Sequence, residues 1–215
     1  MAKVTIGMPI YNGVKAETFA SILNLQIPAG TEFALEIGSL VYDARNRIAM
    51  RAFENGSDYI LWIDADMTFP SDTLVKLLED MEDGKEYVAA LMFTRKIPVS
   101  PLIIEKLIYE EKDGEIKHDV VLYNNYPEDS LFPIAGSGFG CVMTSTNLLK
   151  RIAQKFTVSP FTPIPFLGED YSLNWRAAQL GVPMFCDSRI KCGHVGTLIY
   201  NEGLYKSQGG DPIDP

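Results

Sequence analysis

The sequence predicts an α/β protein with a mostly parallel central sheet covered by helices on both faces. From residue 4 to residue 93, short apolar runs alternate with segments of helical periodicity, the β-α-β order of a parallel sheet. A composition of 47% hydrophobic and 22% charged residues is ordinary for a globular protein. The apolar run Tyr59–Ile63 is followed by two aspartates, which is typical of a buried strand that ends at a ligand site.

Each element follows from its local pattern. We expect strands over residues 4–10, 33–37, 59–63 and 87–93, and helices over 16–25, 39–55 and 72–81. The helices repeat apolar residues at spacings of three and four. The pair Asn55-Gly56 is a signal for the end of the second helix.

After residue 93 the alternation changes. Residues 102–109 and 115–123 are expected to pair as antiparallel strands, because Lys112-Asp113-Gly114 between them is a hairpin turn signal. Residues 94–135 would thus form a small antiparallel excursion. We then expect a strand over 141–144, a helix over 147–156, a loop over 157–167, a helix over 168–180 and a strand over 182–186. We expect one domain over residues 1–205 and a flexible tail over 206–215.

Net charge and cysteine content indicate which partners and which cellular compartment to expect. The net charge of −9 disfavours nucleic acid and anionic membranes as partners. The three cysteines are widely spaced, so we expect reduced core residues and no disulfide framework. No run approaches the roughly 20 apolar residues of a transmembrane segment, and the start lacks signal-peptide features. We therefore expect a cytoplasmic protein.

Asp64 and Asp66 are the first candidate site residues. In an extended chain, residues two apart point to the same side, so both carboxylates would face one spot at the end of the strand. Two like charges so close favour a cation between them, and Mn²⁺ or Mg²⁺ prefers oxygen ligands. The alternative is a helix cap, but Ser71 or Asp72 serves that role better. No P-loop motif is present.

Two later segments carry further candidates. Glu169 and Asp170 lie where a helix begins, so they either cap it through the helix dipole or supply a general base. His194 is either structural or a ligand, and the glycines beside it allow close backbone approach. Gly136, Gly138 and Gly140 permit either a bulge or tight turn or contact between a ligand and the backbone.

Taken together, these motifs resemble the GT-A family of glycosyltransferases, close to the family 2 type. Residues 4–12 resemble the first strand and nucleotide loop of that family, and Asp64-Ala65-Asp66 its Asp-x-Asp motif. Gly136–Phe139 resembles the glycine-rich acceptor-side strand, Gly168-Glu169-Asp170 the catalytic-base motif, and His194 the late metal-binding histidine. The motifs follow the family's order over most of the chain.

The resemblance implies the GT-A fold and metal-dependent transfer of a sugar, with inversion, from a nucleotide-diphosphate donor to a hydroxyl acceptor on a glycan, lipid or protein. Asp66 and His194 would hold Mn²⁺ or Mg²⁺, and Asp64 would contact the ribose or the metal shell. Asp170 would be the base, supported by Glu169. The remaining implied contacts are with the nucleotide (Pro9, Tyr11, Asn12, Asp43, Arg45 and Ala65) and the acceptor (Gly136, Ser137 and Gly138).

The sequence also departs from that family. The acidic residue that holds the nucleobase after the second strand is not evident in residues 36–39, and the added carboxyl-terminal helices of membrane-bound synthases are missing. Two alternatives stay open. A sugar-phosphate nucleotidyltransferase would need a glycine- and lysine-rich loop after the first strand, for which residues 11–15 are a poor substitute. A non-catalytic sugar-nucleotide or glycan-binding module would not require both acidic clusters.

Overall fold

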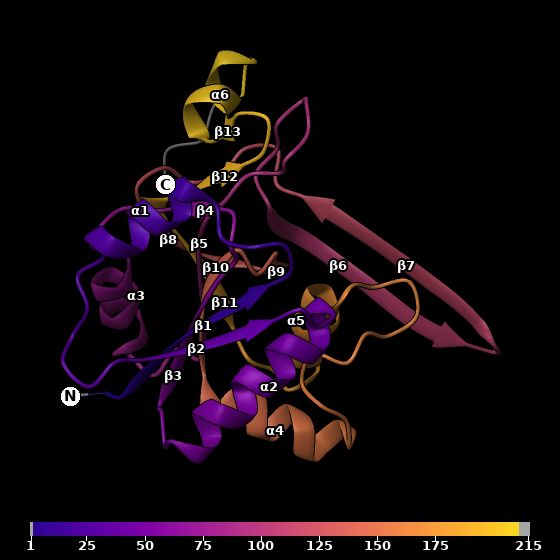
Figure 1. Cartoon of the computed structure of the whole chain (residues 1–215). Helices are drawn as coiled ribbons and strands as arrows, with labels where there is room; N and C mark the ends of the chain where they lie inside the picture. Colours follow the sequence, from indigo (N-terminus) through magenta and orange to yellow (C-terminus); the bar gives the residue numbers. More distant parts are fainter. Residues whose placement is uncertain (1, 211–215) are drawn as a thin grey trace.

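The computed structural model describes residues 2–210, and a seven-stranded sheet runs through its centre (Figure 1). The strand order is β2-β1-β3-β10-β5-β11-β8. The strands are β1 (Val4–Ile10), β2 (Glu32–Ile37), β3 (Tyr59–Ile63), β5 (Tyr87–Leu91), β8 (Leu131–Ile134), β10 (Cys141–Ser145) and β11 (Met184–Lys191). Strand β1 is parallel to β2 and β3, and β5 is parallel to β11. Strand β10 is antiparallel to both β3 and β5, and β8 is antiparallel to β11, so five of the seven strands share one direction.

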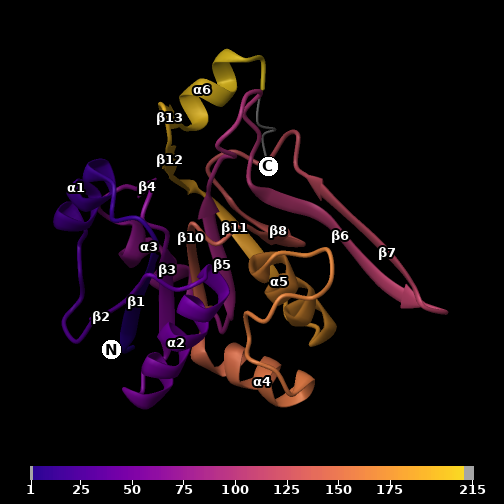
Figure 2. The same ribbon diagram turned by 45° about the vertical axis from the view of Figure 1, so that its right-hand side comes forward.

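Helices pack on both faces of this sheet (Figures 1 and 2). They are α1 (Ala16–Asn24), α2 (Val41–Glu54), α3 (Thr73–Met81), α4 (Thr146–Phe156) and α5 (Glu169–Gln179). Helix α6 (Glu202–Ser207) lies beyond the end of the sheet, beside β13. Helix α2 lies close to β1 because Gly7 has no side chain at the point of contact. A Cβ atom at Gly7 would lie only 2.5 Å from Cγ2 of Ile48. No described helix is long and apolar enough to span a bilayer.

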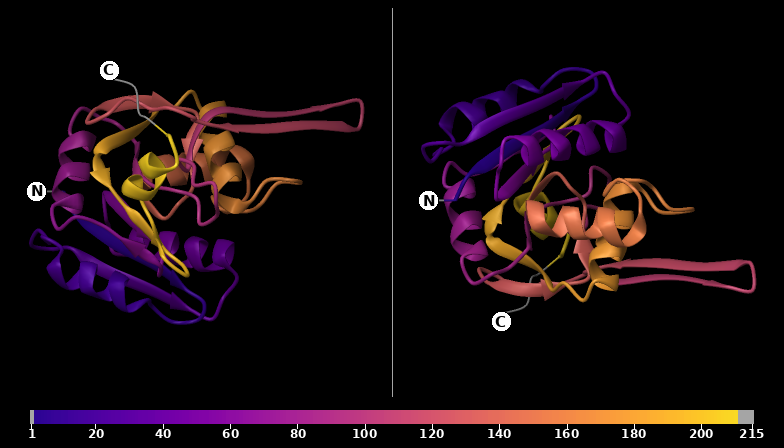
Figure 3. Two further views of the ribbon diagram at one scale, coloured as in Figure 1. Left: turned by 90° about the horizontal axis from the view of Figure 1, so that it is seen from above. Right: turned by 90° about the horizontal axis from the view of Figure 1, so that it is seen from below.

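Two small sheets flank the central one. The first is β13-β12-β4, made of Ile199–Tyr200, Gly193–Val195 and Met67–Thr68. The second is β7-β6-β9, made of Glu115–Leu122, Ile103–Lys112 and Gly136–Ser137. The hairpin of β6 and β7 extends well away from the body of the protein, as the views from above and below show (Figure 3).

Aromatic side chains fill the core beside β3. Trp62 is fully buried, and its ring centroid lies 4.9 Å from that of Phe161. Its indole N–H donates to the hydroxyl of Thr144 on β10 over 2.9 Å, so no buried donor is left unpaired there. The three cysteines are free and buried, as the sequence predicted.

The structure differs from the sequence prediction in several places. Strand β10 lies between β3 and β5 and is antiparallel to both, which the predicted β-α-β alternation did not indicate. Strand β11 continues to Lys191, and the short elements β4, β8, β9, β12, β13 and α6 were not predicted, because two to six residues show no clear periodicity. Helix α6 includes Lys206 and Ser207, which the sequence had suggested for the tail. Residues 211–215 of that tail lie outside the described residues.

Candidate active site

A cavity of about 820 Å³ opens where the carboxyl ends of β1 and β3 meet. This is the edge at which open α/β sheets bind ligands, and the volume suits a small-molecule site. The lining comes from the β1–α1 turn, the start of α2, the residues after β3, and one residue each after β5 and β11. Its members are residues 9–16, Ser39, Leu40, Val41, Asp64, Ala65, Asp66, Arg95 and His194.

Asp64 and Asp66 lie in a tight turn and not in an extended strand. Strand β3 ends at Ile63, and the backbone N–H of Met67 donates to the carbonyl oxygen of Asp64 over 3.3 Å. The turn sends the two carboxylates to different partners: Asp64 binds Arg45, while Asp66 meets Arg95 and His194. Both carboxylates line the same cavity, but the expected extended conformation was wrong, because β3 ends before Asp64.

Arg45 joins the two acidic segments inside the protein. Its guanidinium donates to Asp64 Oδ1 over 2.8 Å and to Glu169 Oε1 over 3.1 Å. The side chain is only 3% exposed, and its charged end lies 5.2 Å from the ring centroid of Phe139 and 5.9 Å from that of Phe161. Burial alone would lower the pKa of Arg45, but the carboxylates of Asp64 and Glu169 raise it overall. Arg45 thus supports the site from within, and the predicted contact between Arg45 and a nucleotide is not available.

Asp170, the predicted base, stands beside this cluster. Burial raises its pKa to about 6, and the neighbouring Glu169 carboxylate adds to the effect, while Arg45 partly offsets it. Its Oδ1 accepts the backbone N–H of Tyr171 over 2.8 Å. Burial also raises the pKa of Asp64, again with an opposing effect from Arg45. A carboxylate whose pKa lies near 6 is suited to accept a proton close to neutral pH.

Asp66 and His194 form the other half of the site. His194 Nε2 lies 3.4 Å from Asp66 Oδ2, and His194 Nδ1 lies 3.1 Å from the carbonyl oxygen of Phe93. Burial would lower the pKa of His194, but the hydrogen bond and charge of Asp66 raise it. For Asp66, burial acts to raise the pKa, and His194 with Arg95 lowers it overall. The two side chains therefore stabilise each other's charged form.

The donor atoms of this pair fit a divalent cation. The carbonyl of Phe93 can only accept, so Nδ1 carries a hydrogen, and the Nε2 lone pair of a neutral ring faces Asp66 Oδ2. A proton or a metal ion between these atoms satisfies both. A histidine that donates its second N–H to a carbonyl is the usual arrangement of a metal ligand. Among the described residues, no three His, Cys, Asp or Glu side chains form a group that could hold a metal ion, so the predicted set of Asp64, Asp66 and His194 is not assembled as a three-ligand site.

The other predicted residues divide into two groups. Pro9, Tyr11, Asn12 and Ala65 line the cavity together with Asp64, Asp66 and His194. Asp43 lies outside the lining and pairs with Arg47 over 2.9 Å on the surface of α2, with both side chains well exposed.

The predicted acceptor residues are also placed elsewhere. Gly136, Ser137 and Gly138 are buried. A Cβ atom at Gly136 would lie 2.6 Å from the side chain of Asn174, and one at Gly138 would lie 2.6 Å from Leu102. Side chains of the protein thus occupy the space next to Gly136 and Gly138. These glycines serve the structure itself, and an acceptor cannot lie against their backbone.

Sequence reasoning missed Arg95 and the start of α2. Arg95 follows β5 at the same sheet edge as Asp66, and a basic residue just after a parallel strand was the available signal. Ser39, Leu40 and Val41 line the cavity, and Leu40 is 63% exposed. These three carry no chemical motif, so only their position at the amino end of α2 could have indicated them.

Comparison with known proteins shows the fold. The structure of GalNAc-T7 with UDP, GalNAc and Mn²⁺ superposes with a TM-score of 0.59 at 9% identity, covering 92% of this chain and 44% of that chain. The chain has a GT-A-like fold. The structure of A197 from STIV superposes with a TM-score of 0.55 at 14% identity, covering 90% of this chain and 86% of that chain. No family model and no curated protein matches the sequence.

Proposed function

We propose that this chain is a metal-dependent glycosyltransferase of family 2 type that moves a sugar from a nucleotide-diphosphate donor to a hydroxyl acceptor, with inversion. One observation carries the proposal: Asp66 and His194 meet, with the histidine tautomer fixed, in a cavity at the carboxyl ends of a GT-A-like sheet. The similarity to GalNAc-T7, whose structure holds UDP, GalNAc and Mn²⁺, supports it.

The cavity offers groups for each part of such a donor. Tyr11 is 72% exposed in the lining, and its ring is available to stack on a base. Arg95 brings a guanidinium, which suits the oxygens of a diphosphate. Asp66 and His194 would hold Mn²⁺ or Mg²⁺, and diphosphate oxygens and water would complete the coordination. When bound, the cation neutralises the charge that develops on the leaving diphosphate.

Asp170 takes the acceptor's proton in this proposal. The acceptor oxygen forms a bond to the anomeric carbon, the bond from that carbon to the diphosphate oxygen breaks, and the proton passes to Asp170. Attack from the side opposite the leaving group inverts the carbon. Arg45 bonds to Asp64, which lines the cavity, and to Glu169, which precedes Asp170 in the chain, so one buried residue links the donor cavity to the segment that carries the proposed base.

Titration calorimetry with nucleoside diphosphates and Mn²⁺ tests the proposal. We expect binding to need the metal, to be lost in Asp66→Ala, and to persist in Asp170→Asn and in the surface control Asp43→Asn. Turnover of the cognate donor should fall by about 10²–10⁴-fold in Asp170→Asn. Undiminished metal-dependent affinity in Asp66→Ala would overturn the donor site. Release of pyrophosphate in place of nucleoside diphosphate would assign nucleotidyl transfer, and binding without turnover would assign a binding module.

A further inference from the structure

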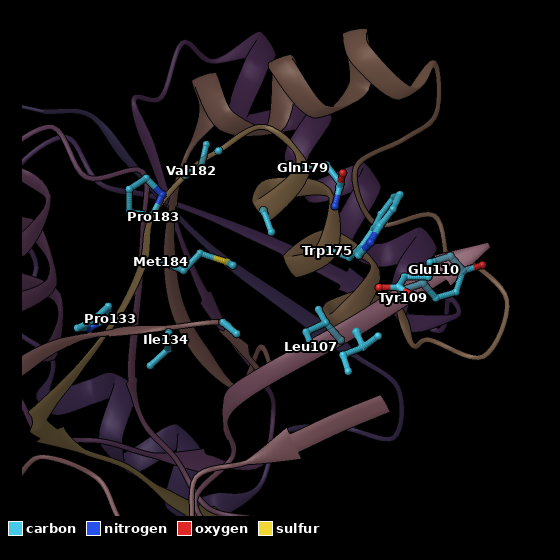
Figure 4. A pocket seen from close by; sticks show the side chains of 14 residues that line it. Leu107, Tyr109, Glu110, Pro133, Ile134, Trp175, Gln179, Val182, Pro183 and Met184 are labelled. Carbon is cyan, nitrogen blue, oxygen red and sulfur yellow. The ribbon is translucent and has the colours of Figure 1, made fainter. Parts of the chain in front are cut away.

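A second cavity, of about 550 Å³, lies between helix α5, strand β6, strand β8 and the start of β11. We call it the α5 cleft. Figure 4 shows Trp175 and Gln179 of α5 on one side and Leu107 and Tyr109 of β6 on another, around the same space. The rings of Trp175 and Tyr109 meet edge to face, with centroids 5.5 Å apart and planes at 70°. Two aromatic rings thus form a stiff corner of the cleft.

The lining defines what the α5 cleft can bind. Apolar surface comes from Leu107, Ile134 and Met184, and polar groups come from Glu110 and Gln179. None of the described lining residues is Lys, Arg or His, and Glu110 repels negative charge, so phosphates and acidic sugars do not fit. An entirely apolar chain would leave the carboxylate and amide without partners. A neutral sugar ring matches all three features, because its C–H face packs on aromatic rings and its hydroxyls bond to carboxylate and amide oxygens.

Helix α5 carries the proposed base at its start and lines the α5 cleft further along. Tyr171, Trp175 and Gln179 are spaced by four residues, so they share that face, and all three are partly or fully exposed. The opposite face, with Ser172, Leu173 and Asn174, is buried. Tyr171 directly follows Asp170, Trp175 and Gln179 line the cleft, and the five steps from residue 170 to residue 175 correspond to a rise of about 7.5 Å along the helix. A ligand of a few sugar units can span that distance.

We propose that the α5 cleft is a saccharide subsite for the acceptor: it binds a non-reacting unit of a neutral oligosaccharide whose reacting hydroxyl lies at Asp170. The acceptor role rests on the proposed function. Binding of the saccharide itself needs neither the donor nor a metal ion, so the cleft can be tested separately.

Tryptophan fluorescence reports on the cleft directly. The chain has two tryptophans; Trp62 is fully buried in the core, whereas Trp175 lines the cleft. We would titrate the full chain, without nucleotide or metal, with neutral tetrasaccharides of glucose, galactose, mannose and N-acetylglucosamine, and with 1-octanol as an apolar probe. We expect saturable changes in emission with at least one saccharide. In Tyr109→Ala, which keeps the reporter, affinity should fall about tenfold, the effect of losing one aromatic contact. The surface control Tyr42→Ala should bind as the wild type does.

The outcomes separate the two proposals. No saturable response to any of these saccharides, an equal response in Tyr109→Ala, or a response to 1-octanol alone would overturn the subsite. If the wild-type protein showed no metal-dependent nucleotide binding, the donor site would be overturned, and the saccharide titrations would not be affected. For a saccharide that binds, transfer of sugar to it should show a raised KM with unchanged kcat in Tyr109→Ala. A bound saccharide that accepts no sugar from an enzyme active on other acceptors would contradict the acceptor role.

Discussion

The donor cavity and the α5 cleft differ in how they are built. The donor cavity collects charged residues that follow strand ends, and most of them belong to short continuous motifs. The α5 cleft collects mostly apolar and aromatic residues from three separate stretches of the sequence, 107–110, 133–135 and 175–184. In the donor cavity, a few charged residues determine what can bind. In the α5 cleft, the shape depends on how whole helices and strands pack. The first kind of site can be found in a sequence, and the second becomes visible only in the fold.

The largest expected effect concerns Arg45, which links the donor cavity to the start of α5. Arg45→Met should destabilise the protein by about 3–5 kcal/mol, because it leaves the Asp64 and Glu169 carboxylates without their buried partner. Urea unfolding measures the change. Arg47→Met, on the same helix but in an exposed pair with Asp43, should stay within about 0.5 kcal/mol of the wild type. Equal stability of the two variants would show that the buried cluster is not a support.

The next effect concerns pH and separates the base from the donor cavity. Asp170 acts as a base only when ionised, and its pKa is raised to about 6. Turnover should therefore be level above pH 7 and fall about tenfold per pH unit below 6, whereas an ordinary aspartate with a pKa of about 3.9 would stay active at pH 5. Rates should be compared with Mn²⁺-dependent nucleotide affinity at each pH, because His194 also gains a proton as pH falls. A flat rate from pH 5 to 8 would show that turnover does not depend on a base with a pKa near 6.

The smallest effect is confined to one end of the donor cavity. Tyr11→Ala should weaken nucleoside diphosphate binding by roughly 5–100-fold, the contribution of stacking one base, and leave pyrophosphate binding unchanged. Calorimetry with both ligands makes the comparison, and Tyr42→Ala, outside the lining, serves as the control. Saccharide titration of the α5 cleft should be unaffected in Tyr11→Ala. An equal loss for both ligands would show that Tyr11 shapes the loop and does not stack on the base.

Much of the fold could be predicted because local pattern and final structure agree. Strands β1, β2 and β3 and helices α2 and α3 lie within a few residues of their predicted bounds, since each has a clear apolar period and a turn signal. The position of β10 could not be predicted, because a strand of five buried residues carries no information about which neighbours it will choose.

The site was predicted in part for the same reason. The position after an apolar strand indicated Asp66, and the flanking glycines and the family resemblance indicated His194; the two side chains meet in the structure. The partner of Asp64 was not foreseen, because a single turn residue decides the direction of a carboxylate. Arg45 has an ordinary helical context in the sequence, and only the rings of Phe139 and Phe161 around it show that it is an interior residue.

The placement of β10 has a consequence for how the chain is completed during synthesis. In the central sheet, β3 bonds to β1 and β10, and β5 bonds to β10 and β11. Until residues 141–145 emerge, the first three strands and β5 have no ladder that connects them, and their facing edges are open to other chains. A chain cut before residue 141 would therefore leave the edges of β3 and β5 unpaired, whereas β10 pairs with both of them in the described structure.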